Sequence, residues 1–186
     1  MTGRGTVAPP AGVESLVSYQ LLPGWRERDA VLLPALRTLY SYTERQPDRA
    51  TGWLYSAGQF GQLPPMAWPE VLAGSGPGLL DQLEATTGIR FPVVCFQAYL
   101  NGAGVDWHYD REWNAQAILS LGVTRTFAVR RLDGGYVEEM QLEHGDLLVM
   151  SPGFQHVWEH SVPAENAPGE RVSLVFRTPQ LTEGDL

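Results

Sequence analysis

The most regular feature of this 186-residue chain is a series of short β-like apolar runs in its second half. Turn-forming pairs such as Asn101-Gly102 and Asp133-Gly134 separate the runs from one another. The predicted strands cover residues 91–100, 117–121, 126–131, 138–142, 146–150, 156–160 and 171–178. Several short strands at this spacing predict a sandwich or jelly roll.

The first half of the chain includes apolar positions at helical spacing. Within residues 13–46, Asp29 can cap a helix whose apolar positions run from Ala30 to Leu39. Pro34 falls early in this helix, where the first turn tolerates it. The segment is therefore predicted to be partly helical.

A stretch rich in aromatic residues, proline and glycine, residues 47–78, follows this helix. It is too long for a simple connector, so it is predicted to be a substrate lid or else a set of strands that the pattern conceals. Residues 79–87 then predict a short amphipathic helix closed by Gly88. Residues 1–13 are predicted to be a flexible lead-in, and residues 14–186 one domain. The expected fold is α+β, mainly β, with N-terminal helices packed on one sheet.

Composition narrows the class of protein. Apolar residues make up 44% of the chain and charged residues 18%, which fits one globular domain with a real core. The net charge of −8 disfavours nucleic acid on average and gives no polybasic footprint, although an acidic mean still allows a local basic patch. All 13 basic residues are arginine, so lysine is excluded from catalysis. The single cysteine, Cys95, excludes an internal disulfide, and no signal or membrane span is visible, so a cytoplasmic location is expected.

Two ionisable residues in the middle of the chain have a spacing that suits metal binding. His108 and Asp110 are two positions apart, and on a strand such positions share a face. Alone, such a pair is usually a surface turn or a core histidine. A distant His156 or His160 can complete two imidazoles and one carboxylate, the iron(II) site of non-haem oxygenases. A zinc hydrolase with the same ligands is the alternative chemistry.

The last predicted strand carries two arginines on one face. With a period of two, Arg171, Ser173 and Arg177 point to the same side, and apolar residues occupy the other. Planar guanidinium groups suit bidentate binding of carboxylates, such as those of a 2-oxoacid cosubstrate. The alternative is an edge strand whose polar face is exposed to solvent. An iron site with open positions for a 2-oxoacid and dioxygen favours the first interpretation.

Taken together, these motifs resemble those of the AlkB-like iron(II)/2-oxoglutarate-dependent dioxygenases. The matching motifs occur in the family's order over about residues 91–178, which the resemblance implies are the catalytic core of a double-stranded β-helix. They are YLNG at 99–102, HYDRE at 108–112, ILSLG at 118–122, LEHGDLLVM at 142–150, WEHSVP at 158–163 and RVSLVFR at 171–177. Residues 52–55 (GWLY) and 66–69 (MAWP) resemble the family's substrate lid.

The resemblance implies a role for each matched residue. The implied iron ligands are His108, Asp110 and His160. The residues implied around 2-oxoglutarate are Tyr99, Arg171 and Arg177, with Gln97 and Ser173 standing where repair members of the family carry asparagines. The residues implied near the substrate are Trp53, Tyr55, Met66 and Trp68 in the lid, and Glu112 beside the metal motif. His156 is expected to support the metal site or the fold, and His144 to be structural.

The resemblance also implies a reaction. Oxidation of 2-oxoglutarate by dioxygen at Fe(II) gives succinate and carbon dioxide and hydroxylates a substrate C–H bond; an N-methyl group is then lost as formaldehyde. The expected substrate is an alkylated base in DNA or RNA, stacked on lid aromatics. The charge of −8 favours a small metabolite, peptide or protein side chain instead. A non-enzymatic metal-binding jelly roll is the third alternative, and no membrane or obligate protein partner is expected.

Overall fold

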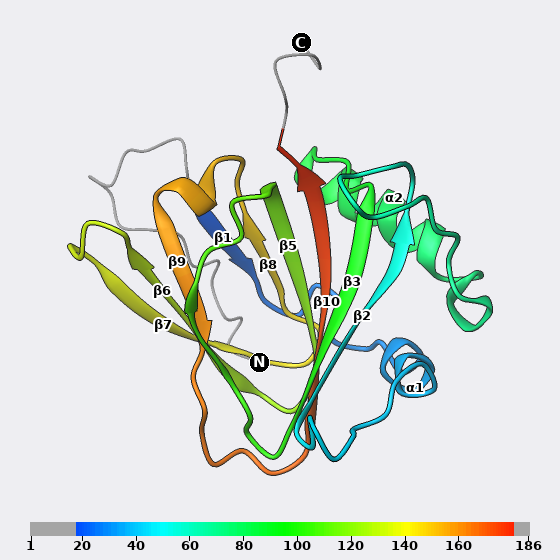
Figure 1. Ribbon diagram of the computed structural model, residues 1–186, viewed down its shortest axis with the longest axis horizontal. Helices are drawn as coiled ribbons and strands as arrows, with labels where there is room; N and C mark the ends of the chain where they lie inside the picture. Colours follow the sequence, from blue (N-terminus) through cyan, green and yellow to red (C-terminus); the bar gives the residue numbers. More distant parts are fainter. Residues whose placement is uncertain (1–17, 181–186) are drawn as a thin grey trace.

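The computed structural model describes residues 18–180, which fold into two antiparallel β-sheets that face each other (Figure 1). The larger sheet has six strands in the order β1-β8-β5-β10-β3-β2. Its strands are β1 (Tyr19–Leu22), β8 (Leu147–Met150), β5 (Trp113–Gly122), β10 (Glu170–Pro179), β3 (Val93–Leu100) and β2 (Arg49–Ser56). The chain's last strand, β10, therefore lies in the interior of the sheet, between β5 and β3.

The smaller sheet has four strands in the order β4-β9-β6-β7. Its strands are β4 (Val105–His108), β9 (Trp158–Val162), β6 (Arg125–Arg131) and β7 (Val137–Leu142). Alternate residues of each strand point inward, because successive side chains of a strand lie on opposite faces. Phe127, Val129 and Trp158 thereby join a buried apolar cluster between the two sheets. The same inward face carries the histidines of the candidate site.

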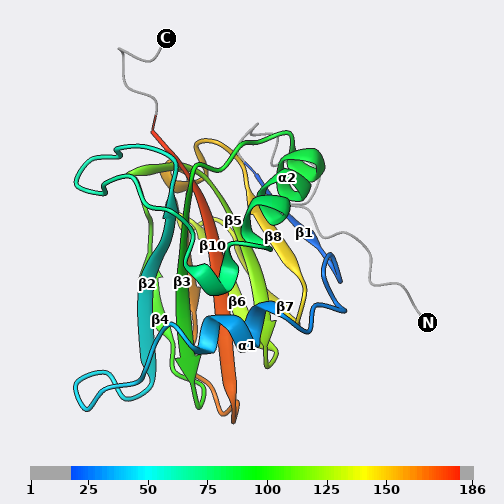
Figure 2. The same ribbon diagram turned by 90° about the vertical axis from the view of Figure 1, so that its right-hand side faces the viewer.

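Helices cover the outer face of the larger sheet (Figure 2). They are α1 (Leu32–Arg37), the 3₁₀ turn η1 (Glu70–Leu72) and α2 (Gly76–Thr87). A second 3₁₀ turn, η2 (Phe154–His156), leads into β9. A second apolar cluster fills the space between these helices and the sheet, with Leu36, Leu83 and Phe176 fully buried. Among residues 18–180, no helix is long and apolar enough to cross a membrane.

The helical predictions are confirmed, with changes in their extent. The carboxylate of Asp29 accepts hydrogen bonds from the backbone N–H groups of Val31 and Leu32, so it caps α1. The second predicted helix begins earlier, at Gly76, and ends at Gly88, whose φ of 69° suits glycine. The segment 13–46 also contains β1, which the helical spacing concealed. The predicted lead-in, residues 1–13, lies outside the described residues.

All seven predicted strands are present, and the prediction of a mainly β fold with few helices is confirmed. For the first part of residues 47–78, the structure has the second alternative given by the sequence, a concealed strand. Residues 49–56 form β2, which pairs with β3 along its whole length as the edge strand of the larger sheet. The composition concealed this strand because Gly52 and a bulge between Trp53 and Tyr55 interrupt its alternation.

Candidate active site

Two histidines meet where β4 pairs with β9 on the inner face of the smaller sheet. His108 and His160 are direct partners in the strand register, and their ring centroids lie 4.2 Å apart. Potential ligand atoms of His108, Asp110 and His160 all lie within 4.8 Å of one another. Two imidazoles and one carboxylate in such a group can hold a metal ion on one side and leave its other positions open. The structure thus brings together the three side chains predicted as ligands.

Both imidazoles have surroundings that suit metal binding. The Nδ1 of His108 lies 2.8 Å from the backbone carbonyl of Asp106, to which it donates, so its Nε2 keeps a free lone pair. Burial, followed by the nearby His108, lowers the pKa of His160 to about 3, so this imidazole is neutral at physiological pH. The ring of His160 stacks on Phe127, with centroids 5.5 Å apart. Neutral imidazole is the form that ligates metals.

Asp110 lies beyond the end of β4, so strand alternation does not place it, contrary to the expectation from its spacing. Other elements hold it instead. Its backbone N–H donates to Oε1 of Gln155 at 3.0 Å. Its Oδ2 accepts hydrogen bonds from Nε2 of Gln116 at 3.1 Å and from Nη2 of Arg177 at 3.2 Å. The convergence of His108 and Asp110 therefore depends on contacts from β5, β10 and η2.

The charge on Asp110 follows from these contacts. Burial alone would raise the pKa of its carboxyl group. The guanidinium of Arg177, the two histidines and the hydrogen bond from Gln116 outweigh burial and hold the pKa below its usual value. Asp110 is therefore a carboxylate at neutral pH, which is the form that binds a cation.

Arg171 is a deeply buried cation on β10. Its side chain is 1% exposed, and neither Nη1 nor Nη2 has a hydrogen-bond partner among the described residues. Its Nε donates to Oγ of Ser120, and its guanidinium carbon lies 5.4 Å from the ring centre of Tyr99. Burial lowers its pKa to about 10, so it stays charged at neutral pH. A buried guanidinium without an acceptor is costly, and a carboxylate ligand would satisfy it.

A small cavity between the sheets joins the histidine end to the arginine strand. It has a volume of about 20 Å³. It is lined by Gln97, Tyr99, His108, Asp110, Gln116, Ile118, Phe127, His160, Val162, Ser173, Val175 and Arg177. Gln97 accepts a hydrogen bond from the hydroxyl of Tyr99, which fixes both side chains at the wall of the cavity. The three metal-ligating side chains and one carboxylate-binding guanidinium, that of Arg177, thus line one cavity.

Trp53 lies next to Arg177, one of the residues that line this cavity. Its ring is 42% exposed and packs at 6.0 Å from that of Trp113. The guanidinium carbon of Arg177 lies 5.9 Å from the ring centre of Trp53 and 5.2 Å from that of Trp113. Trp53 therefore lies between the solvent and Arg177, the residue that contacts Asp110. This position suits a side chain near the substrate.

The other aromatic residues predicted near the substrate lie elsewhere. The bulge in β2 turns Tyr55 to the outer face of the larger sheet, where its ring stacks on Trp68 at 5.0 Å. Both rings pack against the apolar cluster beneath the helices, not against the histidines. Met66 pairs its backbone with Ser56 through two hydrogen bonds and folds the intervening loop back on β2. Glu112 is exposed in the turn that follows Asp110.

The two remaining histidines hold parts of the fold together. Nδ1 of His144 accepts the backbone N–H of Gly122, and its Nε2 donates to the carbonyl of Asp29. This hydrogen-bond pattern agrees with the structural role expected for His144. His156 is exposed on η2 and accepts a hydrogen bond from the side-chain amide of Gln180.

The sequence reasoning missed the residues that support the site from other strands. Gln116 and Gln155 are both 1% exposed and both contact Asp110. Arg125 is also 1% exposed, and it binds Glu165 and the carbonyls of Gly102 and Pro163. The sequence offered one signal for Gln116, namely a single amide within an apolar strand. Such a residue is expected to have a hydrogen-bond partner, because buried polar groups need partners.

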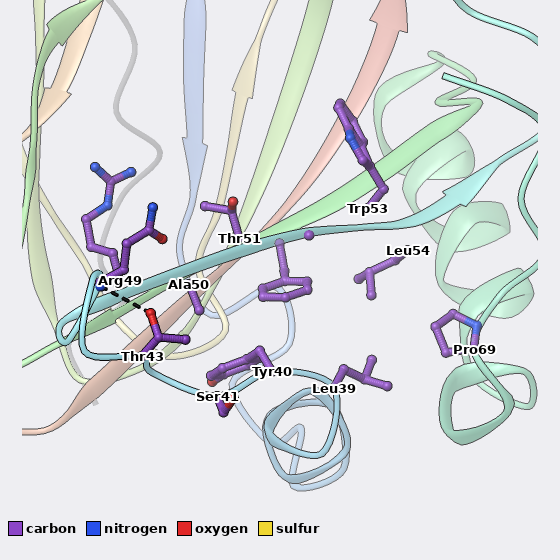
Figure 3. A pocket seen from close by; sticks show the side chains of 13 residues that line it. Leu39, Tyr40, Ser41, Thr43, Arg49, Ala50, Thr51, Trp53, Leu54 and Pro69 are labelled. Atoms are coloured by element: carbon purple, nitrogen blue, oxygen red, sulfur yellow. Dashed lines mark hydrogen bonds between the residues drawn. The ribbon is translucent and has the colours of Figure 1, made fainter. Parts of the chain in front are cut away.

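A wider cavity of about 450 Å³ lies on the opposite side of β2 (Figure 3). Figure 3 shows Tyr40, Leu39 and Leu54 on one side of the strand and the Trp53 side chain pointing to the other. None of the three candidate metal ligands lines this cavity. The chemistry predicted from the sequence therefore belongs to the smaller cavity between the sheets.

Known proteins are similar to this chain in sequence and in fold. The model of the 2OG-Fe(II) oxygenase superfamily matches residues 36–177. The human alpha-ketoglutarate-dependent dioxygenase alkB homolog 3 is 36% identical over 156 residues, which cover 73% of this chain and 53% of that protein. The mouse DNA oxidative demethylase ALKBH2 is 31% identical over 130 residues, 62% of this chain and 53% of that protein. This chain thus spans about half the length of these curated relatives.

Solved structures agree on the fold. A 2OG-Fe(II) oxygenase family oxidoreductase from Burkholderia pseudomallei matches with a TM-score of 0.57 and 18% identity, over 86% of this chain and 82% of that chain. OsALKBH1 matches with a TM-score of 0.57 and 17% identity, over 86% of this chain and 97% of that chain. Family membership implies Fe(II) and 2-oxoglutarate, and the donor set described above fits both. The chain belongs to the 2OG-Fe(II) oxygenase superfamily, as a member of its AlkB-like family.

Proposed function

We propose that this chain is an Fe(II)- and 2-oxoglutarate-dependent dioxygenase that removes alkyl groups from nucleobases. The observation that carries the proposal is a cluster of three metal-ligating side chains in contact with Arg177 of β10, together with Arg171 on the same face of that strand, a buried guanidinium whose Nη atoms have no acceptor among the described residues. The cluster of ligands suits a bound cation, and the guanidinium suits a bound anion. Fe(II) and 2-oxoglutarate supply both charges within one reaction.

His108, Asp110 and His160 would hold the iron. When bound, iron and 2-oxoglutarate together supply the oxidising power that hydroxylates a C–H bond with dioxygen, and 2-oxoglutarate leaves as succinate and carbon dioxide. Burial keeps His160 neutral, and Asp110 is ionised, so neither of these two ligands must lose a proton before metal binds. These residues share one rim of the cavity, which leaves the opposite side for cosubstrate and dioxygen.

The two arginines of β10 would bind opposite ends of 2-oxoglutarate. Arg177 contacts the metal ligand Asp110, so it lies at the end where the 2-oxoacid group meets the metal. Arg171 lies six residues away on the same face of the strand, beside Tyr99, which suits the distal carboxylate. Gln97 and Ser173 line the cavity between these ends and offer hydrogen bonds to the cosubstrate.

An alkylated base is the substrate that the cavity mouth supports best. Trp53 offers an exposed ring for stacking next to the metal end. On the loop that carries Asp110, Arg111 stacks on the exposed Tyr109 at 4.2 Å, which places a cation and an aromatic face near the mouth. Glu112 on the same loop can accept hydrogen bonds from a base edge. The human and mouse relatives named above are a dioxygenase and a DNA oxidative demethylase.

The finer fold assignment belongs to the same proposal. We assign the two facing sheets to a double-stranded β-helix, with the helices packed on the outside of the larger sheet. The two histidine ligands then project from the smaller sheet and the cosubstrate arginines from the larger one. Such an arrangement encloses the reacting atoms between two rigid walls.

A coupled assay tests the proposal. Purified protein with Fe(II) and 2-oxoglutarate should release succinate and formaldehyde from single-stranded oligonucleotides that carry N-methylated bases. His108→Ala, Asp110→Ala and His160→Ala should each abolish both products while the fold persists. Full activity in any of these variants contradicts the ligand assignment. Succinate release stimulated by a small metabolite or peptide, and not by any methylated oligonucleotide, would instead favour the second substrate class suggested by the charge of −8.

A further inference from the structure

We propose that Gln116 and Gln155 are positioning residues that hold Asp110 in its metal-binding orientation, and that Gln116 does so without depending on Arg177. The inference rests on the metal site of the proposed function. It concerns two buried amides that neither the motifs nor the comparisons assign to any role. Both come from elements outside the segment that carries Asp110.

Asp110 needs support because its own segment supplies little. β4 ends at His108, and Asp110 follows in an irregular stretch. Its neighbours Tyr109, Arg111 and Glu112 are all exposed. A metal ligand on such a loop has many alternative orientations unless other groups fix it, and ordering it on metal binding would weaken the affinity. The fixing contacts must come from the packed parts of the protein.

Gln116 supplies the first contact from the middle of the larger sheet. It lies on β5, opposite Met150 of β8 and opposite Arg177 of β10, and is 1% exposed. Its flanking residues Ala115 and Ala117 are apolar and buried. Burying an amide among apolar residues is unfavourable unless it forms hydrogen bonds. The amide of Gln116 meets this requirement, because its Nε2 donates a hydrogen bond to Oδ2 of Asp110 at 3.1 Å.

Arg177 also donates to Oδ2, but it has a second task. Its Nε is buried without a partner among the described residues, and its guanidinium faces the cavity wall. When a cosubstrate carboxylate binds this guanidinium, the hydrogen bond to Asp110 competes with it. Gln116 is neutral, so a cosubstrate carboxylate attracts its amide less strongly than the guanidinium, and its hydrogen bond to Oδ2 persists. With Oδ2 held, Oδ1 is the oxygen left for the metal.

Gln155 supplies the complementary contact to the backbone. It is 1% exposed on η2, and its Oε1 accepts the N–H of Asp110 at 3.0 Å. Its own Nε2 lies 4.0 Å from Sδ of Met150, on the strand next to β5. The two glutamines therefore fix Asp110 at two points, one on the main chain and one on the carboxylate. Such outer contacts commonly change metal affinity by about 10- to 100-fold.

The test measures metal binding directly, with Mn(II) as the probe under anaerobic conditions and without 2-oxoglutarate. Gln116→Met keeps the length and volume of the side chain but removes the donor. We expect its dissociation constant for Mn(II) to rise about 10- to 100-fold. Gln155→Met should show a rise of the same kind. Thr126→Val is the matched control, since it loses a part-buried hydrogen bond to Glu165, which is not one of the metal ligands, and should bind Mn(II) like the wild type.

A second readout separates positioning from mere loss of structure. In Gln116→Met, the ratio of succinate to formaldehyde should rise several-fold, because a misplaced carboxylate permits oxidation of 2-oxoglutarate without oxidation of the substrate. Melting temperatures identify variants that fail to fold. If Gln116→Met does not fold, Gln116→Asn, one methylene shorter and still polar, gives the same measurement.

Each outcome has one meaning. Wild-type protein that binds no Mn(II) contradicts the proposed function itself. Wild-type protein that binds Mn(II), together with a folded Gln116 variant whose Mn(II) affinity lies within twofold of it, overturns the inference and leaves the proposed function intact. An unchanged product ratio in a variant with weakened Mn(II) binding overturns the claim that Gln116 orients the carboxylate during turnover.

Discussion

Arg171 and Arg125 are both 1% exposed, yet the structure gives them opposite roles. Arg125 is fully engaged, with Glu165 and two backbone carbonyls as its partners. Arg171 has no acceptor for either Nη among the described residues. Replacing each arginine with methionine, which retains most of the side-chain volume, should therefore have contrasting effects on stability and on cosubstrate binding.

For Arg171→Met we expect a large loss of 2-oxoglutarate affinity without a loss of stability. Two hydrogen bonds to a charged partner are worth about 3 kcal/mol or more, which corresponds to a rise in Kd of about 100-fold or more. In the absence of 2-oxoglutarate, the variant no longer buries an unpaired cation, so its melting temperature should equal or exceed that of the wild type. For Arg125→Met we expect a free energy of unfolding lower by about 2 kcal/mol or more, because buried acceptors lose their donor.

Thermal unfolding with and without 2-oxoglutarate, in protein loaded with Mn(II), measures both effects. At 100 times its Kd, 2-oxoglutarate should stabilise the wild type by about 2.7 kcal/mol, or about 5–11 °C for a chain of this size. The same concentration should leave Arg171→Met almost unchanged and should still stabilise Arg125→Met. Two results would refute the reasoning. One is a 2-oxoglutarate-induced rise in the melting temperature of Arg171→Met as large as that of the wild type. The other is a strongly destabilised Arg171→Met protein before any ligand is added.

Three further predictions concern single side chains. Trp53→Ala should raise the KM for a methylated oligonucleotide several-fold and leave the KM for 2-oxoglutarate unchanged; equal effects on both contradict its role at the mouth. Burial opposes ionisation of Glu165, but hydrogen bonds from Thr126 and Arg125 lower the pKa of its carboxyl group. The ionised Glu165 therefore stabilises the fold at neutral pH, and this stabilisation is lost as the pH falls through the lowered pKa. The unfolding free energies of wild type and Glu165→Gln should therefore converge in acid, as urea titrations at several pH values would show. Asp29→Ala should lower the unfolding free energy by about 1 kcal/mol, measured in the same way, because α1 loses its cap.

The sequence predicted the part of the site that depends on regular alternation. The two arginines of β10 share a face because strand periodicity places residues six positions apart on the same side, and the structure pairs that strand with β3 and β5 throughout. The pairing of His108 with His160 could not be read from spacing, because it depends on how β4 meets β9. The motif resemblance supplied that information instead.

Local irregularities account for the remaining differences. The bulge after Trp53 sends Tyr55 to the outer face, although a regular strand would keep both on one side. Gly52 weakens the strand pattern of β2, yet a Cβ there would lie 2.6 Å from the ring of Phe96, so packing against β3 requires the glycine. Gln116 and Gln155 are distant in sequence from Asp110, and only the folded chain shows that both contact it.

The central claim is that His108, Asp110, His160 and the arginines of β10 form one joint site for Fe(II) and 2-oxoglutarate. Anaerobic titration of 2-oxoglutarate into the Fe(II)-loaded protein tests it most directly, because a 2-oxoacid that chelates Fe(II) produces a visible charge-transfer absorption. The account predicts an absorption that saturates at one equivalent of each component and is missing in His160→Ala. No such absorption in the wild-type protein, at saturating concentrations of both, would contradict it.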